Sequence, residues 1–184
     1  MTSSQQPPAF TLPMVLLSKG YALRPETEAD IPFLMRLYAS TREDEFAAVP
    51  WTAEQKQAFM ASQFQAQRHH YRTQIDGCIF EVLEYDGVPA GRLYLDVRHT
   101  RLHIVDIALL PECRGRGIGT AILQTLIATA ESDGKGVGIF VEKFNPALRL
   151  YRRLGFTDIA DTGVYLEMEW LPESAAAGPQ HASL

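Results

Sequence analysis

The chain has 184 residues, of which 46% are apolar and 21% are charged, and this composition predicts one domain built around a single core. Its formal net charge of −5 argues against a nucleic-acid partner, because proteins that bind nucleic acids usually carry a basic face. The two cysteines, Cys78 and Cys113, lie far apart and form no C-x-x-C pattern, so they indicate neither a zinc site nor a disulfide framework. No metal site is therefore predicted.

Both ends of the chain are predicted to be flexible tails. Residues 1–18 are rich in Pro, Gln and Ser, and residues 173–184 are small and polar without a hydrophobic period. The N-terminus lacks the basic region of a secretory signal, and the apolar run around Pro13 is too short to span a bilayer. We therefore expect one domain over residues 19–172, no contact with a membrane, and a cytoplasmic location.

The first part of the domain is predicted to be mainly helical. A short strand over residues 21–24 precedes a helix over residues 28–40, in which the apolar side chains share one face. A second helix is expected from Thr52 to about His70, because Thr52 and Gln55 have the form of a capping box.

From residue 78 onward the pattern predicts strands first and then an alternation of helices and strands. A hairpin turning at Asp86-Gly87 is followed by a third strand, and Gly155 is expected to end the last helix. The expected strands are 78–85, 88–98, 102–110, 137–141, 156–159 and 164–170, and the expected helices are 117–132 and 147–154. This order predicts an α/β (α+β) domain with a mixed sheet of six to seven strands and about four helices on both of its faces.

One loop between a strand and a helix has the composition of a phosphate site. The segment from Arg114 to Thr120 reads RGRGIGT, and its three glycines let the backbone approach a ligand closely. The first turn of a helix presents free N–H groups and a partial positive charge, and the two arginines add to it. The segment fits neither the dinucleotide motif, because position 120 is Thr, nor the P-loop, because it has no lysine. A tight turn without a ligand is the alternative.

Three segments, in order, resemble the GNAT superfamily of N-acetyltransferases over about residues 20–170. IVDIALLPECRGRGIGTAIL is similar to the family's fourth strand, pyrophosphate loop and third helix. GVGIFVEKFNPALRLYRRLGF is similar to its fifth strand and fourth helix, and YALRPETEADIPFLMRLY to its first strand and helix. The resemblance implies the GNAT fold, with a mostly antiparallel sheet, and acetyl-CoA as co-substrate.

The resemblance also implies which residues bind acetyl-CoA. The pyrophosphate is expected at the backbone amides of the loop, namely Arg114, Gly115, Arg116, Gly117, Ile118, Gly119 and Thr120. Backbone groups of Ile107, Ala108 and Leu109 would pair with the pantetheine arm, and Asn145 would lie near it. Asn145 could equally cap the helix that begins after Pro146.

Tyr151 matches the tyrosine that, in this family, protonates the departing thiolate, although it could also be a core residue. The base that accepts the proton of the attacking amine is less defined. His103 and Asp106 on the fourth strand are the candidates, and Glu81, Asp96 or a chain of water molecules are alternatives.

The acceptor implied by the resemblance is a small-molecule amine or a peptide N-terminus, and a homodimer is left open. The family builds its acceptor pocket from the first two helices and the last hairpin, and the candidates here are Tyr38, Phe46, Trp51, His69, His70 and Tyr165. The expected activity is acetyl transfer from acetyl-CoA to a primary amine in a ternary complex. The alternative is a non-catalytic acyl-CoA-binding regulatory module.

Overall fold

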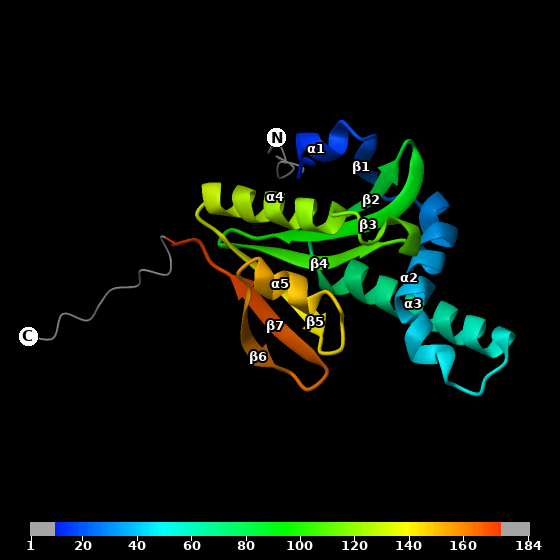
Figure 1. Ribbon diagram of the computed structural model, residues 1–184. Helices are drawn as coiled ribbons and strands as arrows, with labels where there is room; N and C mark the ends of the chain where they lie inside the picture. The colour runs from blue at the N-terminus through cyan, green and yellow to red at the C-terminus, as the bar shows by residue number, and fades with distance from the viewer. Residues whose placement is uncertain (1–9, 174–184) are drawn as a thin grey trace, which may run out of the picture.

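The computed structural model describes residues 10–173, in which seven strands form one twisted sheet (Figure 1). The sheet has the order β1-β2-β3-β4-β5-β7-β6. Its strands are β1 (Tyr21–Pro25), β2 (Ile79–Tyr85), β3 (Val88–Val97), β4 (Arg101–Leu109), β5 (Gly136–Glu142), β6 (Thr157–Asp161) and β7 (Tyr165–Trp170). β4 and β5 run parallel, and the other neighbours run antiparallel. The predicted mixed, mostly antiparallel sheet is confirmed.

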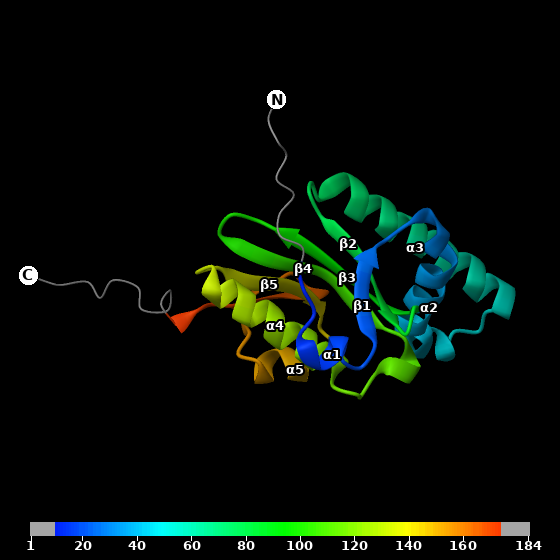
Figure 2. The ribbon, with the colours of Figure 1, turned by 90° about the horizontal axis from the view of Figure 1, so that it is seen from above.

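Helices cover both faces of this sheet (Figures 1 and 2). They are α1 (Met14–Leu17), α2 (Ile31–Ala47), α3 (Ala53–Gln74), α4 (Ile118–Ser132) and α5 (Leu148–Arg153), and two short 3-10 turns lie at Glu28–Asp30 and Pro111–Cys113. α1, α4 and α5 share one core with the sheet, whereas α2 and α3 form a second core on the opposite face. The prediction of about four helices omitted α1.

The larger core explains why α4 lies on the sheet. Ile118, Ile122 and Leu126 recur at helical spacing and are buried against strand residues such as Leu95 and Ile139. Each fully buried aliphatic side chain of this kind contributes about 1.5–3 kcal/mol relative to exposure. The smaller core holds Phe33, Leu34, Leu37, Tyr38, Met60, Phe64 and Val82. Because α2 and α3 are fixed there, they form one wall of the cleft described below.

The structure corrects the prediction that residues 1–18 form a flexible tail, at least from residue 10 onward. α1 follows Pro13, and both Leu12 and Leu16 are buried in the larger core. A four-residue helix is too short to show a hydrophobic period, so the pattern could not reveal it. Residues 1–9 and most of the predicted C-terminal tail, 174–184, lie outside the described residues.

Local signals placed most other element boundaries correctly. Thr52 Oγ1 accepts a hydrogen bond from the Gln55 amide at 3.2 Å, and the Thr52 amide donates one to Gln55 Oε1 at 2.9 Å, as the capping box predicts. Asp86 and Gly87 have φ angles of 48° and 77°, the left-handed conformation that their hairpin turn requires. α2 continues past its predicted end at Ser40 to Ala47.

Candidate active site

A cleft opens where β4 and β5 separate. Their parallel pairing ends at Ile104 and Ile139, and the strands then diverge toward their C-terminal ends. The cleft has a volume of about 170 Å³ and is bounded by α2 and α3 on one side and by the start of α5 on the other. Its lining residues are Tyr38, Thr41, Arg42, Gln67, Tyr71, Arg92, Val105, Asp106, Ile107, Ala108, Ile139, Phe140, Val141, Glu142, Asn145, Tyr151 and Tyr165.

A β-bulge in β4 determines which of its side chains face α4 and which face α2 and α3. Asp106 pairs with Tyr94 and Ile104 with Leu95, so Val105 between them has no partner on β3. The extra residue shifts the alternation of the strand. Ile107 therefore packs against the α4 core, while Asp106 faces the side of α2 and α3.

The glycine-rich loop connects β4 to α4 and leaves room for a ligand. Gly115 and Gly117 have φ angles of 71° and 79°, which only glycine adopts without strain, and Gly117 is the N-cap of α4. A Cβ atom added at Gly115, Gly117 or Gly119 would meet nothing within 4 Å. The loop thus combines open space with the free N–H groups of a helix N-terminus, which is the chemistry that binds phosphate.

Arg114 fixes this loop to its surroundings. Its Nε donates to the Leu109 carbonyl at 2.9 Å, and its Nη2 donates to the Ser40 hydroxyl at 3.0 Å. The side chain therefore ties the loop to the end of β4 and to α2. Both arginines are exposed, but within the described residues only Arg114 makes a side-chain hydrogen bond, so Arg116 is the one left for an anionic ligand.

Tyr151 and Asn145 both line the cleft on the α5 side. Tyr151 is 4% exposed and packs against Phe156, and burial, followed by the charge of Asp106, raises the pKa of its hydroxyl. The hydroxyl is therefore protonated at neutral pH and able to donate. Asn145 Oδ1 accepts a hydrogen bond from the Ala147 amide at 2.9 Å in an Asx turn, but the N-cap of α5 is Ala147, so Asn145 borders the cleft without capping the helix.

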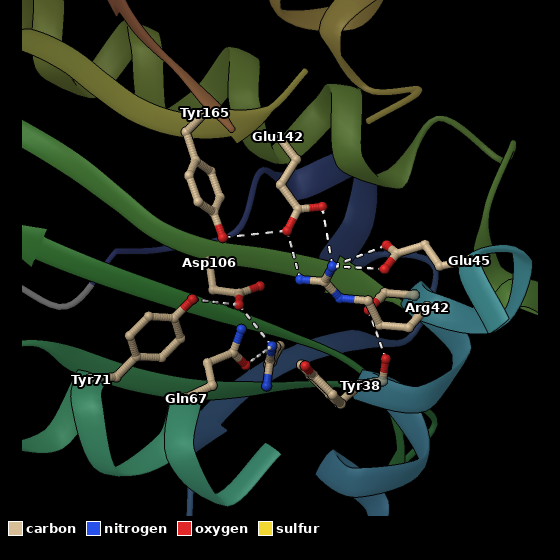
Figure 3. A network of polar contacts seen from close by, with 10 residues as sticks. Tyr38, Arg42, Glu45, Gln67, Tyr71, Asp106, Glu142 and Tyr165 are labelled. Carbon is tan, nitrogen blue, oxygen red and sulfur yellow. Dashed lines mark hydrogen bonds and ion pairs between the residues drawn. The ribbon is translucent and has the colours of Figure 1, made fainter. Parts of the chain in front are cut away.

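On the opposite side of the cleft, Asp106 is held by groups from α3 and β3 (Figure 3). Its Oδ2 accepts hydrogen bonds from Arg92 Nη2 at 2.7 Å and from the Tyr71 hydroxyl at 3.2 Å. Arg92 Nη2 also donates to Gln67 Oε1 at 3.0 Å. Burial, followed by the charge of Asp106, raises the pKa of Tyr71, which therefore stays a neutral donor.

A second ion pair crosses the cleft from α2 to β5. Arg42 Nη2 contacts Glu142 Oε1 at 2.6 Å, and Arg42 Nη1 contacts Glu45 at 3.0 Å (Figure 3). The Tyr165 hydroxyl donates to Glu142 Oε1 at 3.4 Å. Arg42 and Glu142 were not found from the sequence, because Arg42 lies beyond the predicted end of its helix and their pairing spans 100 positions.

His103 lies outside this arrangement. It is not among the residues that line the cleft in the described part of the chain, and its ring contacts Phe140 edge-on. Burial, and then the neighbouring Arg101, lower the pKa of His103 to about 4. The two candidate bases on β4 therefore occupy different surroundings, and Asp106 is the one that the fold brings to the cleft.

The aromatic acceptor candidates divide in the same way. Tyr38 and Tyr165 line the cleft, whereas Phe46 and Trp51 pack with Phe59 beside the smaller core, where α2 ends and α3 begins. The polar cleft residues that sequence reasoning missed are Thr41, Arg42, Gln67, Tyr71, Arg92 and Glu142. Each is a common residue without a local motif, so no signal in the sequence marked them.

Two features are absent from residues 10–173. No helix there combines the length and apolar character that crossing a bilayer requires. The same residues contain no group of three or more His, Cys, Asp or Glu side chains arranged to hold a metal ion.

Comparison with known sequences and structures gives consistent matches. The chain is 38% identical over 66 residues to a GCN5-like protein acetyltransferase of Mycobacterium tuberculosis, a match over 30% of this chain and 28% of that protein. It is 35% identical over 60 residues to an N-alpha-acetyltransferase of Sulfurisphaera tokodaii, over 31% and 36% of the two chains. The matches thus span well under half the length of these curated relatives.

Solved structures match over most of the chain. The PaiA N-acetyltransferase of Thermoplasma acidophilum, solved in complex with coenzyme A, superposes with a TM-score of 0.61 over 82% of this chain and 98% of that one, at 16% identity. This likeness confirms the predicted fold. Residues 34–156, more than half of the sequence, match the model of the acetyltransferase (GNAT) family. The chain therefore belongs to the acetyltransferase (GNAT) family.

Proposed function

We propose that the chain transfers the acetyl group of acetyl-CoA to the primary amine of an acceptor, by direct attack in a ternary complex. The observation that carries the proposal is the cleft between β4 and β5, which has Tyr151 on one side and Asp106 and Tyr71 on the other. Members of this family use acetyl-CoA as co-substrate, and the residues present fit it.

The donor would bind along the loop and the open end of β4. The amides of residues 114–120 would bind the pyrophosphate, with Arg116 adding charge, and backbone groups of residues 107–109 would pair with the pantetheine arm. Asn145 would border that arm on the α5 side. This assignment places the thioester between Ile107 and Tyr151.

The chemistry then needs a proton donor and a path for a proton to leave. The acceptor nitrogen attacks the thioester carbonyl carbon, the C–N bond forms, and the C–S bond breaks as the Tyr151 hydroxyl gives its proton to the sulfur. The amide of Ile107 or Leu109 would stabilise the negative charge on the carbonyl oxygen. The proton of the amine would pass to Asp106 and from there to water in the cleft. In the described residues the hydrogen bonds to Asp106 reach only Oδ2, so Oδ1 is left to accept from the amine. This proposal assigns His103 no proton transfer.

The test is release of free thiol from acetyl-CoA across a panel of primary amines. We expect turnover with at least one amine, and a fall of about 10²-fold in kcat for Tyr151→Phe, the size typical of losing a general acid, with the Kd for coenzyme A unchanged. Equal kcat for Tyr151→Phe and the original chain would contradict the role of this tyrosine. The alternative, a non-catalytic acyl-CoA-binding module, predicts stabilisation by coenzyme A without thiol release for any amine.

A further inference from the structure

The ion pairs around Arg42 carry more negative than positive charge, while the lining of the cleft itself is balanced, with Arg42 and Arg92 against Asp106 and Glu142. Arg42 is shared between Glu142 at 2.6 Å and Glu45 at 3.0 Å. On the same face of the sheet, Arg101 is shared between Glu167 at 3.0 Å and Glu169 at 3.5 Å. Each arginine therefore meets two carboxylates, and each group of three keeps one negative charge in excess.

Three of these acidic residues, Glu142, Glu167 and Glu169, lie on one face of β5 and β7. Along the pairing of β5 with β7, Glu142 lies opposite Tyr165, Phe140 lies opposite Glu167, and Gly138 lies opposite Glu169. Successive pairs that are two residues apart point to the same face of a sheet. Phe140 and Tyr165 are 48% and 40% exposed, so this face is open to a ligand.

The arginines of the cleft are not available to an anionic acceptor. In the described lining, Arg42 is paired with Glu142 and Glu45, and Arg92 is 4% exposed and engaged by Asp106 and Gln67. An acceptor with a carboxylate would face Glu142 and Asp106 without a free guanidinium, and such a placement of like charges disfavours binding.

The same region already accommodates a cation. The Arg42 guanidinium lies 5.8 Å from the centre of the Tyr38 ring and reaches Glu142, whose carboxylate also accepts from Tyr165. Glu142 is partly exposed, so a second ammonium group can approach it beside Arg42. Aromatic rings around a carboxylate favour an organic cation over an anion.

We propose that the acceptor is an amine that carries a second positive charge, and that Glu142 determines this specificity by binding the second charge. The inference rests on the proposed function in one respect: the reacting amine lies at Asp106, across the cleft from Glu142. The ligand is defined by its chemistry, two cationic groups joined by an aliphatic chain, as in a diamine or a lysine-bearing peptide.

The experiment compares acceptors that differ only at the distal end. Three series with chains of three to six carbons are used: alkylamines, α,ω-diamines and ω-amino carboxylates. We expect kcat/KM, measured by thiol release, to be about tenfold higher for the best diamine than for the matched alkylamine, and lowest for the amino carboxylate. Equal kcat/KM in the first two series, or a preference for the carboxylates, would overturn the inference while leaving acetyl transfer intact.

The Glu142→Gln variant shows whether this residue is responsible. We expect it to reduce the ratio of diamine to alkylamine activity to about one, and this ratio is independent of the fraction of protein that is folded. Asp158→Asn, which breaks the exposed ion pair of Asp158 with Arg152 at 2.8 Å, is the matched control and should leave the ratio unchanged. A ratio that persists in Glu142→Gln would assign the second charge to another group and contradict the proposal.

Two further arms separate the outcomes. Calorimetric titration of the same amines into the protein saturated with coenzyme A measures the preference for a second positive charge without turnover. If the chain releases no thiol with any amine, the proposed function is refuted, but a preference measured by calorimetry would still support this inference. Glycyl-lysinamide compared with glycyl-norleucinamide applies the second-charge test to peptides. Once diamines are preferred over the matched alkylamines, the faster of diamine and lysinamide identifies the source of the second charge.

Discussion

Arg92 on β3 and Asp106 on β4 form an ion pair of 2.7 Å, with side chains only 4% and 14% exposed. Removing one partner of such a pair leaves the other charge buried without compensation. We predict that Arg92→Leu lowers the free energy of unfolding by about 3–5 kcal/mol, measured by urea denaturation. The double variant Arg92→Leu/Asp106→Leu should recover part of this loss, because it leaves no unpaired charge.

The surface pair of Arg152 with Asp158 provides the control for this prediction. Both side chains are about half exposed, so Arg152→Leu should change the free energy of unfolding by less than about 1 kcal/mol. Similar losses in the free energy of unfolding for Arg92→Leu and Arg152→Leu would show that burial does not make the cleft pair more sensitive to the removal of one partner.

The glycine loop allows stability and ligand binding to be separated. Gly117 has a φ of 79°, so Gly117→Ala should cost about 1–2 kcal/mol of stability through backbone strain. Gly119 lies in the first turn of α4 without a positive φ, so Gly119→Ala should keep or slightly raise stability.

The second substitution also tests the ligand. An added methyl group at Gly119 enters open space at the helix N-terminus, where we place the pyrophosphate. Gly119→Ala is therefore expected to weaken coenzyme A binding about tenfold, measured by calorimetry, in a protein that is at least as stable as the original. Unchanged affinity for coenzyme A in this variant would show that the pyrophosphate does not bind at this loop.

His103 should make the stability of the protein depend on pH. Its pKa is lowered to about 4 in the folded chain, by burial first and by Arg101 next, against about 6.5 for an unperturbed histidine. Between these values the unfolded chain binds the proton more readily, so stability is full above about pH 6.5 and falls as the pH drops toward 4. Allowing for solvent screening, we expect a loss of about 1–2 kcal/mol.

His103→Gln should remove this component of the pH dependence, measured by denaturation at pH 7 and pH 4.5, and His99→Gln, at an exposed position, should not. Because His103 does not line the cleft, its variant should also keep the pH profile of thiol release. A lost acidic limb of that profile would instead support the prediction, made from the sequence, that His103 is a base.

The sequence predicted those parts of the site that depend on interactions between residues close together in the chain. The loop, the Thr52 capping box and the Asp86-Gly87 turn depend on neighbours within a few residues, so their residue types reveal them. Gly115 and Gly117 adopt the positive φ angles that the glycines suggested.

The acceptor side depends on contacts between distant segments, and the sequence did not reveal it. Arg42 meets Glu142 across 100 positions, and Arg92 meets Asp106 only because a bulge in β4 turns that carboxylate toward α3. The bulge itself has no glycine or proline to mark it. Choosing between His103 and Asp106 as the base required the register of β4, which pattern reasoning does not supply.

The N-terminal segment gives the last prediction, because its role was misjudged from composition. Leu16 is 3% exposed in the larger core, while its neighbour Leu17 is 39% exposed. Leu16→Ala should lower the free energy of unfolding by about 2–4 kcal/mol, since it removes buried methyl groups and leaves a cavity. Leu17→Ala, in the same four-residue helix, should cost less than about 1 kcal/mol. If residues 10–18 were a flexible tail, both substitutions would leave urea denaturation unchanged; a difference between them requires that α1 is packed on the domain.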